Sequence, residues 1–439
     1  MKLWQEKASL DSLVEAFTVG DDRQLDLLLA KYDVAGNRAH ARMLAEVGLL
    51  QPEAADLLDA ELTKIDATID AGRFEIEHGV EDVHSQIELL LTRELGDTGK
   101  RIHTARSRND QVLTDLRLFF RAELRAIAGL MRGLFSCCLQ LSERHQAIAM
   151  PGYTHSQIAM PSSFGLWFGC FAESLIDDLR QLIATYQTVN QNPLGSAAGY
   201  GSSFPIDRQH TTELLEFDDL CYNVVYAQFG RGRTELSVAF SLSMLATTLN
   251  KLASDVVLFS SGNYKFLRLP DHLTTGSSIM PHKKNPDVFE LIRARCNQLQ
   301  SLPIEINLLI TNLMTGYHRD FQLLKERLFP ALERTRTMLA LLIEVLPQLE
   351  PTTDILSADP ERYRYLYTVE EVDALVQAGT PFRDAYHRVS AAVNDGSYTP
   401  PTPAVHTHIG SKDNLATAAI QAKWDKVWRQ LSLHSPGTE

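Results

Sequence analysis

The sequence predicts an all-α protein with a bundle of long helices at its centre. Several long segments are nearly free of Gly and Pro and carry apolar residues at intervals of three and four, which is the spacing of one helix face. Alternating apolar and polar residues, the pattern of a half-buried strand, are scarce. The central segments also exceed the mean globular helix of about 11–12 residues, and long helices bury their apolar faces by packing along one another.

One long helix is predicted to begin after Asn109 and to run for about thirty residues. Its apolar residues follow one another in steps of three or four: Leu116, Phe120, Leu124, Ile127, Met131, Leu134, Cys138 and Leu141. Four more long helices are expected over residues 164–190, 234–260, 287–315 and 322–348. Pro303 predicts a kink in one of them, because proline removes a backbone hydrogen bond inside a helix. Apolar residues on more than one face of the second helix favour self-association: Phe164, Trp167, Phe168, Phe171 and Leu175.

Shorter helices are expected on both sides of this bundle. They cover residues 21–32, 34–48, 51–72, 81–95, 369–378 and 381–394, and short strands or loops are expected at 192–207 and 261–275. The change in helix length near both ends of the bundle predicts three domains. These are an N-terminal helical domain over residues 1–105, the long-helix bundle over 106–350, and a small C-terminal helical domain over 351–439.

The composition is that of a globular protein, with 44% apolar and 22% charged residues. The net charge of −13 argues against binding to nucleic acid or to an anionic lipid surface. No run approaches the ~18 uninterrupted apolar residues of a spanning helix, and charges near the N-terminus argue against a signal peptide. The five cysteines form no CxxC motif and are expected to be reduced core residues of a cytoplasmic protein.

A polar run precedes the first long helix, from His103 to Gln111. Ser107 and Asp110 have the spacing of a capping box, and Asn109 is a good N-cap, so helix capping alone is one interpretation. Capping needs one or two polar side chains, whereas eight of these nine residues are polar. The free N–H groups of a helix start, together with two arginines, also form a site for an anion.

A histidine lies in a second polar segment, Pro151–Gln157. A lone histidine is usually structural, and this is the first interpretation of His155. However, the segment is a Gly/Pro-bounded loop between two long helices, where functional residues concentrate. Histidine is also the side chain best suited to proton transfer near neutral pH.

The third segment reads TGSSIMPHKKNPD and covers residues 275–287. Asn285 and Pro286 are suited to cap and start a helix. Lys283 and Lys284 stand just before that helix, although the helix dipole there favours anions. A local rule broken in a Gly/Ser loop indicates a ligand site, and these two cations would attract carboxylates.

Together these segments resemble the argininosuccinate lyase family of the fumarase/aspartase superfamily. The third segment is similar to the superfamily signature GSSxMPxKxNP, while SRNDQV at 107–112 and PGYTHSQ at 151–157 are similar to motifs of this family. The first four residues, MKLW, and PFRDAYHRV near 381–389 also fit. The resemblance covers about residues 1–420. It implies a three-domain fumarase/aspartase-like fold with a central five-helix bundle.

The resemblance implies elimination of L-argininosuccinate to L-arginine and fumarate, the last step of arginine biosynthesis, without a cofactor or a metal. It implies Ser277 as the base and His155 as the acid, with Glu290 orienting the acid. Lys283 would supply positive charge beside Ser277 and would hold the succinyl carboxylates together with Asn285. The remaining substrate contacts that it implies are Ser107, Arg108, Asn109, Thr154, Tyr317, Gln322 and Lys325. It also implies a homotetramer whose sites are each shared between three subunits.

The chain departs from the family pattern at several places. Gln5–Lys7 replace GGRF, Gly230–Arg233 replace SDRD, and Ala105 stands in the usual HTGRSRND. The substrate-contacting serine near residue 20 is not evident in Thr18–Asp22. His282 stands where the family has glutamine. It is expected to be a solvent-facing loop residue, and the alternative is that His282 is the catalytic base.

Two alternatives are weighed against this function. Adenylosuccinate lyase has a histidine at the position of His282, but it would need a phosphate site, and the sequence has no Gly-rich phosphate loop. A non-catalytic crystallin-like member predicts damage at the catalytic positions, which are intact. His406 and His408 lack a third ligand nearby and are expected to form a surface turn rather than a metal site.

Overall fold

The computed structural model describes residues 12–432. Their contacts divide the chain into two compact units, and each long helix contributes one part to each unit. Unit 1 contains residues 12–128, 181–244 and 298–336, and unit 2 contains residues 129–180, 245–297 and 337–432. The three-domain division made from the sequence stays a prediction. MKLW and Gln5–Lys7 lie outside the described residues.

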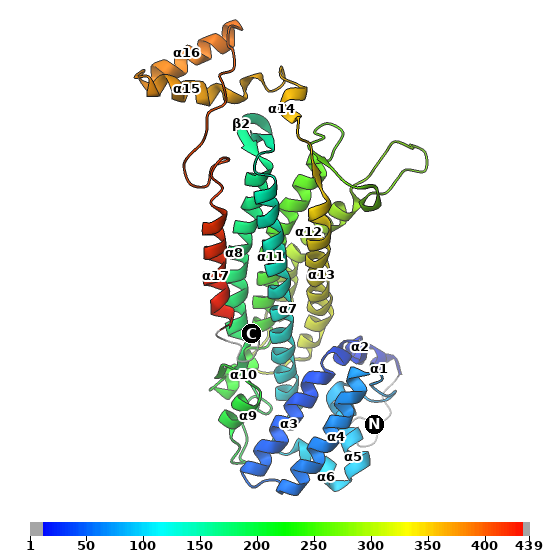
Figure 1. The fold of residues 1–439 in the computed structure, drawn as a ribbon. Helices are drawn as coiled ribbons and strands as arrows, with labels where there is room; N and C mark the ends of the chain where they lie inside the picture. The colour runs from blue at the N-terminus through cyan, green and yellow to red at the C-terminus, as the bar shows by residue number, and fades with distance from the viewer. Residues whose placement is uncertain (1–11, 433–439) are drawn as a thin grey trace. The chain divides into compact units, whose positions relative to one another are not determined.

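Within residues 12–432, the five longest helices have between 23 and 37 residues each (Figure 1). They are α7 (Arg108–Arg144), α8 (Phe164–Val189), α11 (Arg233–Phe259), α12 (Asp287–Ile310) and α13 (Leu323–Val345). The strands of the described residues are few, and the longest of them has seven residues. The predicted fold class is therefore confirmed.

Unit 1 adds short helices and one two-residue parallel strand pair to its parts of the long helices. Its helix α3 packs against α4 and α5, as Figure 1 shows for α3 and α4. Its own elements are α1 (Ser12–Val19), α2 (Asp22–Leu25), α3 (Ala30–Glu46), α4 (Pro52–Asp70), α5 (Val83–Leu95), α6 (Asp97–Lys100), β3 (Gln191–Asn192), α9 (Arg208–Leu214), β4 (Asp219–Leu220) and α10 (Val224–Phe229).

Unit 2 contains an antiparallel hairpin, a second small strand pair and the C-terminal helices. The hairpin is formed by β1 and β2, and α15 packs against α16. Its own elements are β1 (Ala149–Thr154), β2 (Gln157–Ser163), β5 (Leu267–Arg268), β6 (Glu350–Pro351), α14 (Ile355–Ala358), α15 (Thr368–Gln377), α16 (Phe382–Asp395) and α17 (Thr417–Ser432).

Aromatic side chains fill the core of each unit. In unit 1, the ring of Phe119 on α7 lies 4.5 Å from that of Phe329 on α13 and 5.8 Å from that of Tyr32 on α3. In unit 2, the Phe135 ring on α7 stacks on Trp424 of α17 at 4.2 Å. Buried aromatic rings contribute large apolar areas and prefer such offset or tilted contacts.

The long helices were predicted well, but some boundaries were wrong. Helix α12 ends at Ile310 rather than near residue 315, and Pro303 lies inside it. Helix α3 runs through residue 33, where a break was predicted. The Asp33 carboxylate is buried and accepts hydrogen bonds from neighbouring side chains, so this polar residue does not interrupt the helix. The loop predicted at 151–157 is the outer part of a hairpin that covers residues 149–163.

The capping box before α7 is confirmed, whereas Asn109 as N-cap is wrong. Asp110 Oδ1 accepts a hydrogen bond from Ser107 N at 3.0 Å, and Ser107 Oγ accepts one from Asn109 N at 3.2 Å. Ser107 therefore caps the helix, and Asn109 stands in its first turn. Among the cysteines, Cys170 is exposed and was wrongly assigned to the core, while the other four are buried and free.

The exposed apolar residues are not those that the sequence indicated. Phe164, Trp167, Phe168, Phe171 and Leu175 are at most 9% exposed, because the chain itself buries them. Large exposed apolar side chains lie instead on α11 and α12. Phe240 and Met244 are about half exposed, and Ile304 and Leu308 about two-thirds.

Two of the described helices are long and apolar enough over 18 residues to cross a membrane, namely α7 and α11. The protein itself buries 50% of that window in α7 and 56% in α11. Buried core helices share this composition, so the prediction of no membrane partner is unchanged.

Candidate active site

A polar pocket in unit 1 gathers most of the substrate-binding residues predicted for that unit. Its cavity of about 120 Å³ has room for several water molecules. Five predicted residues line it: Arg108, Asn109, Tyr317, Gln322 and Lys325. The sixth, Ser107, caps helix α7 beside it.

The pocket also contains charged residues that the sequence did not single out. They come from the segment before α3, the start of α5, the start of α11 and the turn before α13: Asp22, Asp26, Glu81, Asp82, His84, Arg231 and Arg319. Glu81, Asp82 and His84 lie close together in sequence at the start of a helix. That local cluster was the signal available in the sequence.

The side chain of Lys325 is bound by two carboxylates. Its Nζ lies 2.7 Å from Asp22 Oδ1 and 2.5 Å from Asp26 Oδ1. Burial alone would lower the pKa of Lys325, but the charges of Asp26 and Asp22 raise it above its usual value. Burial also raises the pKa of Asp22 to about 6, partly opposed by the charge of Lys325.

Gln322 fixes the backbone that leads to Asp22. Its Nε2 donates to the carbonyl oxygens of Thr18 and Val19, at 3.1 and 3.0 Å. Arg319 also donates to the carbonyl of Thr18, at 2.6 Å. In this structure Gln322 and Lys325 therefore bind the segment before α3.

The remaining cations of the pocket have carboxylate partners. Arg108 Nη1 lies 2.7 Å from Asp82 Oδ2, and Arg319 Nη2 lies 2.8 Å from Glu81 Oε1. Arg231 pairs with Glu235 at 2.8 Å. Glu81 also lies 3.3 Å from Arg108 Nη1, so it contacts two arginines. By contrast, Lys325 is one cation that contacts two carboxylates.

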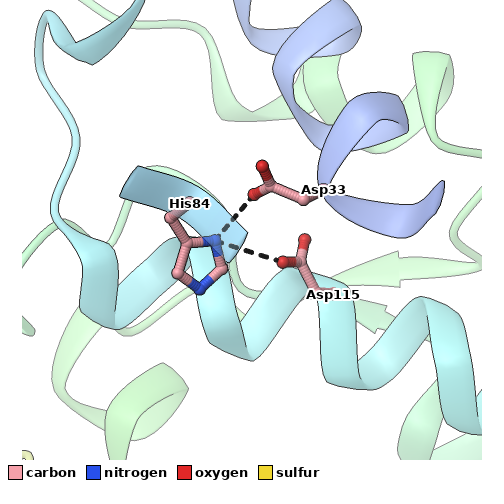
Figure 2. A group of neighbouring side chains, drawn as sticks. All are labelled: Asp33, His84 and Asp115. Atoms are coloured by element: carbon pink, nitrogen blue, oxygen red, sulfur yellow. Dashed lines mark hydrogen bonds and ion pairs between the residues drawn. The ribbon is translucent and has the colours of Figure 1, made fainter. Parts of the chain in front are cut away.

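At the wall of the pocket, His84 is held between two buried carboxyl groups (Figure 2). Its Nδ1 lies 2.7 Å from Asp33 Oδ1 and 3.4 Å from Asp115 Oδ2. Burial would lower the pKa of His84, but Asp33 and then Asp115 raise it to about 10. Burial and the charge of Asp33 raise the pKa of Asp115 well above its ordinary value. His84 is therefore held as an imidazolium between these two carboxyl groups.

Asp33, His84 and Asp115 also have the spacing of a metal site, since their ligand atoms lie within 4.8 Å of one another. A metal ion would need His84 Nδ1 without its proton, and that nitrogen is already within hydrogen-bond distance of Asp33. The second oxygen of Asp33 accepts from Asn37 Nδ2 at 2.9 Å. We therefore interpret the group as an ion pair, and the expectation of no metal stays a prediction.

Unit 2 contains the signature loop that the sequence indicated. Thr275 and Asn285 pair through their backbones and close the loop at its base. The Asn285 amide donates to Thr275 Oγ1 at 3.3 Å and to the Gly276 carbonyl at 3.4 Å. Asn285 therefore links the two ends of the loop. Glu290 follows in the first turn of α12.

Within this loop, Ser277 and Lys283 have different surroundings from their neighbours. Ser277 Oγ accepts hydrogen bonds from the backbone N–H groups of Met280, at 3.1 Å, and Ile279, at 3.4 Å. Lys284 pairs with Asp271, and among residues 12–432 no such pair is recorded for Lys283. Ser278 and His282 are exposed.

His155 lies at the tip of the β1–β2 hairpin, and Thr154 is the last residue of β1. The turn residues His155 and Ser156 have φ of +52° and +59°, a left-handed conformation that such residues rarely adopt. His155 is exposed. A two-residue hairpin turn requires positive φ at both central residues, so the turn accounts for this backbone conformation and leaves the imidazole accessible.

The predicted residues thus fall into two groups, the pocket of unit 1 and the loop and hairpin of unit 2. Among the described residues, His155 makes no hydrogen bond or ion pair with Glu290 or with Ser277. His406 pairs with Glu370 at 2.9 Å, so this histidine is anchored and is not simply a surface residue.

Comparison with known proteins indicates one family. Residues 6–301 match the family model described as Lyase. The argininosuccinate lyase of Parabacteroides distasonis is 53% identical over 426 residues, which cover 97% of this chain and 95% of that protein. The argininosuccinate lyase of Thermotoga neapolitana is 39% identical over 389 residues, 89% of this chain and 97% of that protein.

Solved structures share the fold. The class II fumarase of Schistosoma mansoni matches with a TM-score of 0.74 over 97% of this chain and 95% of that one, at 16% identity. An EDDS lyase in complex with formate matches with the same TM-score of 0.74 over 98% of this chain and 91% of that one, at 23% identity.

The His84 ion pair predicts a pH-dependent stability. The pKa of His84 rises from 6.5 to about 10 on folding, so its contribution is complete below pH 6.5 and is lost as the pH rises toward 10. His84→Gln should lower the free energy of unfolding at pH 7 by about 3–5 kcal/mol, because it leaves a buried carboxylate unpaired. Thermal unfolding at a fixed protein concentration measures both effects.

Between pH 7 and pH 10, the wild-type melting temperature should fall more steeply than that of His84→Gln. The matched control is His78→Gln, since His78 is exposed and its replacement should change stability by less than about 0.5 kcal/mol. Equal pH slopes for wild type and His84→Gln would contradict the ion-pair interpretation.

Proposed function

This chain belongs to the lyase family, and we propose that it converts L-argininosuccinate to L-arginine and fumarate as a cytoplasmic enzyme of arginine biosynthesis. The near full-length similarity to argininosuccinate lyases is the observation that carries the proposal. The structure adds a charged pocket of a size suited to an amino-acid head group and a closed Gly/Ser loop bearing a serine and a lysine.

The proposed chemistry is a β-elimination. A base removes a proton from the succinyl CH₂ carbon, which lies next to a carboxylate, and the carbanion is stabilised as the aci-form of that carboxylate. The C–N bond then breaks, and an acid protonates the departing guanidino nitrogen. Carbanion formation dominates the barrier, so prepositioned donors and cations near the carboxylates supply the largest stabilisation.

We assign the base to Ser277. Its oxygen accepts backbone N–H groups, and such donors favour the ionised form of a hydroxyl. Lys283 adds a positive charge six residues along the same loop, without a recorded acidic partner in the described chain. Lys283 and Asn285 then hold the succinyl carboxylates while the loop excludes water, which strengthens both charges.

We assign the acid to His155, with Glu290 as its orienting partner from another subunit. His155 is exposed at a hairpin tip, where it is accessible to a neighbouring chain. The exposed apolar residues of α11 and α12 support association into a homotetramer. Thr154 would contact substrate beside His155, and Ser107, Arg108, Asn109, Tyr317, Gln322 and Lys325 would bind the arginine part.

The direct test measures fumarate by its absorbance with two substrates in turn. Fumarate should be released from argininosuccinate and not from adenylosuccinate, because the described pocket offers no Gly-rich phosphate loop. If the protein converts adenylosuccinate but not argininosuccinate, its function is that of an adenylosuccinate lyase and the proposed function is wrong. Absence of turnover on both substrates would favour the non-catalytic alternative.

Substitutions in the loop test the base. Ser277→Ala should lose about 10²–10⁴ in kcat, the usual effect of removing a general base, while the exposed Ser278→Ala should lose much less. His282→Gln restores the usual family residue and should keep its activity. Normal turnover of Ser277→Ala, or loss of turnover in His282→Gln, would show that another residue of the loop is the base.

Mixing two inactive variants tests the shared site. His155→Asn and Lys283→Ala should each be inactive and should regain partial activity when unfolded together and reassembled, because some hybrid sites receive both intact residues. Light scattering should give the mass of about four chains of 49.2 kDa. A monomer, or mixed tetramers without activity, would argue against sites shared between subunits.

A further inference from the structure

The segment that leads into helix α7 contains a residue in an unfavourable backbone conformation. Ala105 has a φ of +61°, which lies in the left-handed region that residues other than glycine rarely adopt. The close approach of Cβ to the following carbonyl oxygen disfavours this region by roughly 5–30-fold in population. Ala105 also stands where the family motif has glycine. The surrounding structure must therefore hold this residue in its conformation.

Two side chains of helix α3 bind the residues on either side of Ala105. His40 Nε2 donates a hydrogen bond to the Thr104 carbonyl oxygen at 2.8 Å. Arg106 Nη2 donates to Asn37 Oδ1 at 2.7 Å. Asn37 and His40 are three positions apart, so they lie on one face of α3. They contact the chain immediately before and immediately after the left-handed residue.

Both contacts are buried, and each has a defined donor and acceptor. His40 is 0% exposed and Asn37 is 2% exposed. Burial lowers the pKa of His40 well below its ordinary value, and the charge of Arg106 lowers it further. The neutral ring carries one proton, which lies on Nε2 because the carbonyl of Thr104 can only accept. The Asn37 amide is oriented by Asp33, whose backbone and side-chain oxygens accept hydrogen bonds from Asn37 Nδ2.

The same segment begins helix α7 and contributes to the wall of the pocket in unit 1. Ser107 caps the helix, while Arg108 and Asn109 line the pocket. Because φ and ψ are the only soft angles of the backbone, a change of φ at Ala105 redirects the residues that follow it relative to α3. The conformation of this one residue therefore decides where the three side chains lie.

We propose that His40 and Asn37 are positioning residues that hold Ala105 in its left-handed conformation. The clamp formed by these two side chains thereby places Arg108 and Asn109 at the pocket before substrate arrives. The pocket lining, as far as the structure describes it, includes neither His40 nor Asn37, so both act through the segment that they hold. The proposal rests on the proposed function for the identity of the substrate.

A double-mutant cycle between positions 40 and 105 tests the clamp. His40→Leu removes the donor, and the segment should then leave its left-handed conformation. KM for argininosuccinate should rise by about 5–30-fold, because only the remaining fraction of the protein is competent to bind. The value of kcat should stay within about threefold, since saturating substrate selects the competent form. When combined with Ala105→Gly, His40→Leu should raise KM by less than about threefold, because glycine adopts positive φ readily.

Two further variants separate positioning from a loss of stability. His40→Gln keeps an N–H donor at a similar reach and should keep KM within about threefold of wild type. Val34→Ala is the matched control, since Val34 is buried on α3 and lies about 100° around the helix from Asp33. It should lower the melting temperature and leave KM unchanged, with or without Ala105→Gly.

Two kinetic results would overturn the proposal. If His40→Leu raises KM by the same factor with and without Ala105→Gly, His40 only stabilises the fold and the clamp does not control Ala105. An unchanged KM in His40→Leu would likewise show that this side chain positions nothing.

Hydrogen–deuterium exchange gives a readout that needs no substrate. The amides of Arg106 and Ser107 are hydrogen-bonded within the segment, so peptides covering residues 103–110 should exchange faster in His40→Leu, and those of the β1–β2 hairpin should not. Unchanged exchange at 103–110, or an equal rise in the hairpin, would contradict the clamp. Fumarate release by wild type is scored separately: faster exchange confined to 103–110 without any turnover would contradict the proposed function alone.

Discussion

The buried carboxylate of Asp33 is the group on which the polar part of unit 1 depends. One of its oxygens accepts from His84 at the start of α5, and the other from Asn37 on its own helix. Asn37 in turn accepts from Arg106, just before α7. An uncompensated charge at this depth would cost several kcal/mol. The three segments therefore have one arrangement relative to each other in which Asp33 and His84 are paired and Arg106 donates to Asn37.

The pocket is built from residues that flank this network. Glu81 and Asp82 immediately precede the helical turn with His84, and Arg108 and Asn109 follow Arg106 by two and three positions. The contacts that hold Asp33 thus also hold the walls of the pocket. Charges placed in this way need no reorganisation when a ligand arrives, and such preorganisation is the usual source of electrostatic catalysis.

The sequence predicted the features that depend on residues close together along the chain, and it missed contacts between residues far apart along the chain. Helical spacing is a local property, and it predicted α7, α8, α11 and α13 closely. The family resemblance predicted Arg108, Tyr317 and Lys325, which line one pocket. Asp33 was misinterpreted as a helix break, because its partner His84 lies 51 residues away. Asp22 and Asp26 were missed for the same reason, since they contact Lys325 about 300 positions later.

The chemistry that we propose for unit 2 depends on association between copies of the chain. His155 and Lys283 are exposed in the single chain. In water the charge of Lys283 acts through a high dielectric, and a serine alkoxide would be too costly to form in the same loop. The apolar side chains of Phe240, Ile304 and Leu308 are exposed in the same chain. Packing these faces against further copies would exclude water from the apolar surface, and a site completed at such an interface would gain the low dielectric that Ser277 needs to act as a base.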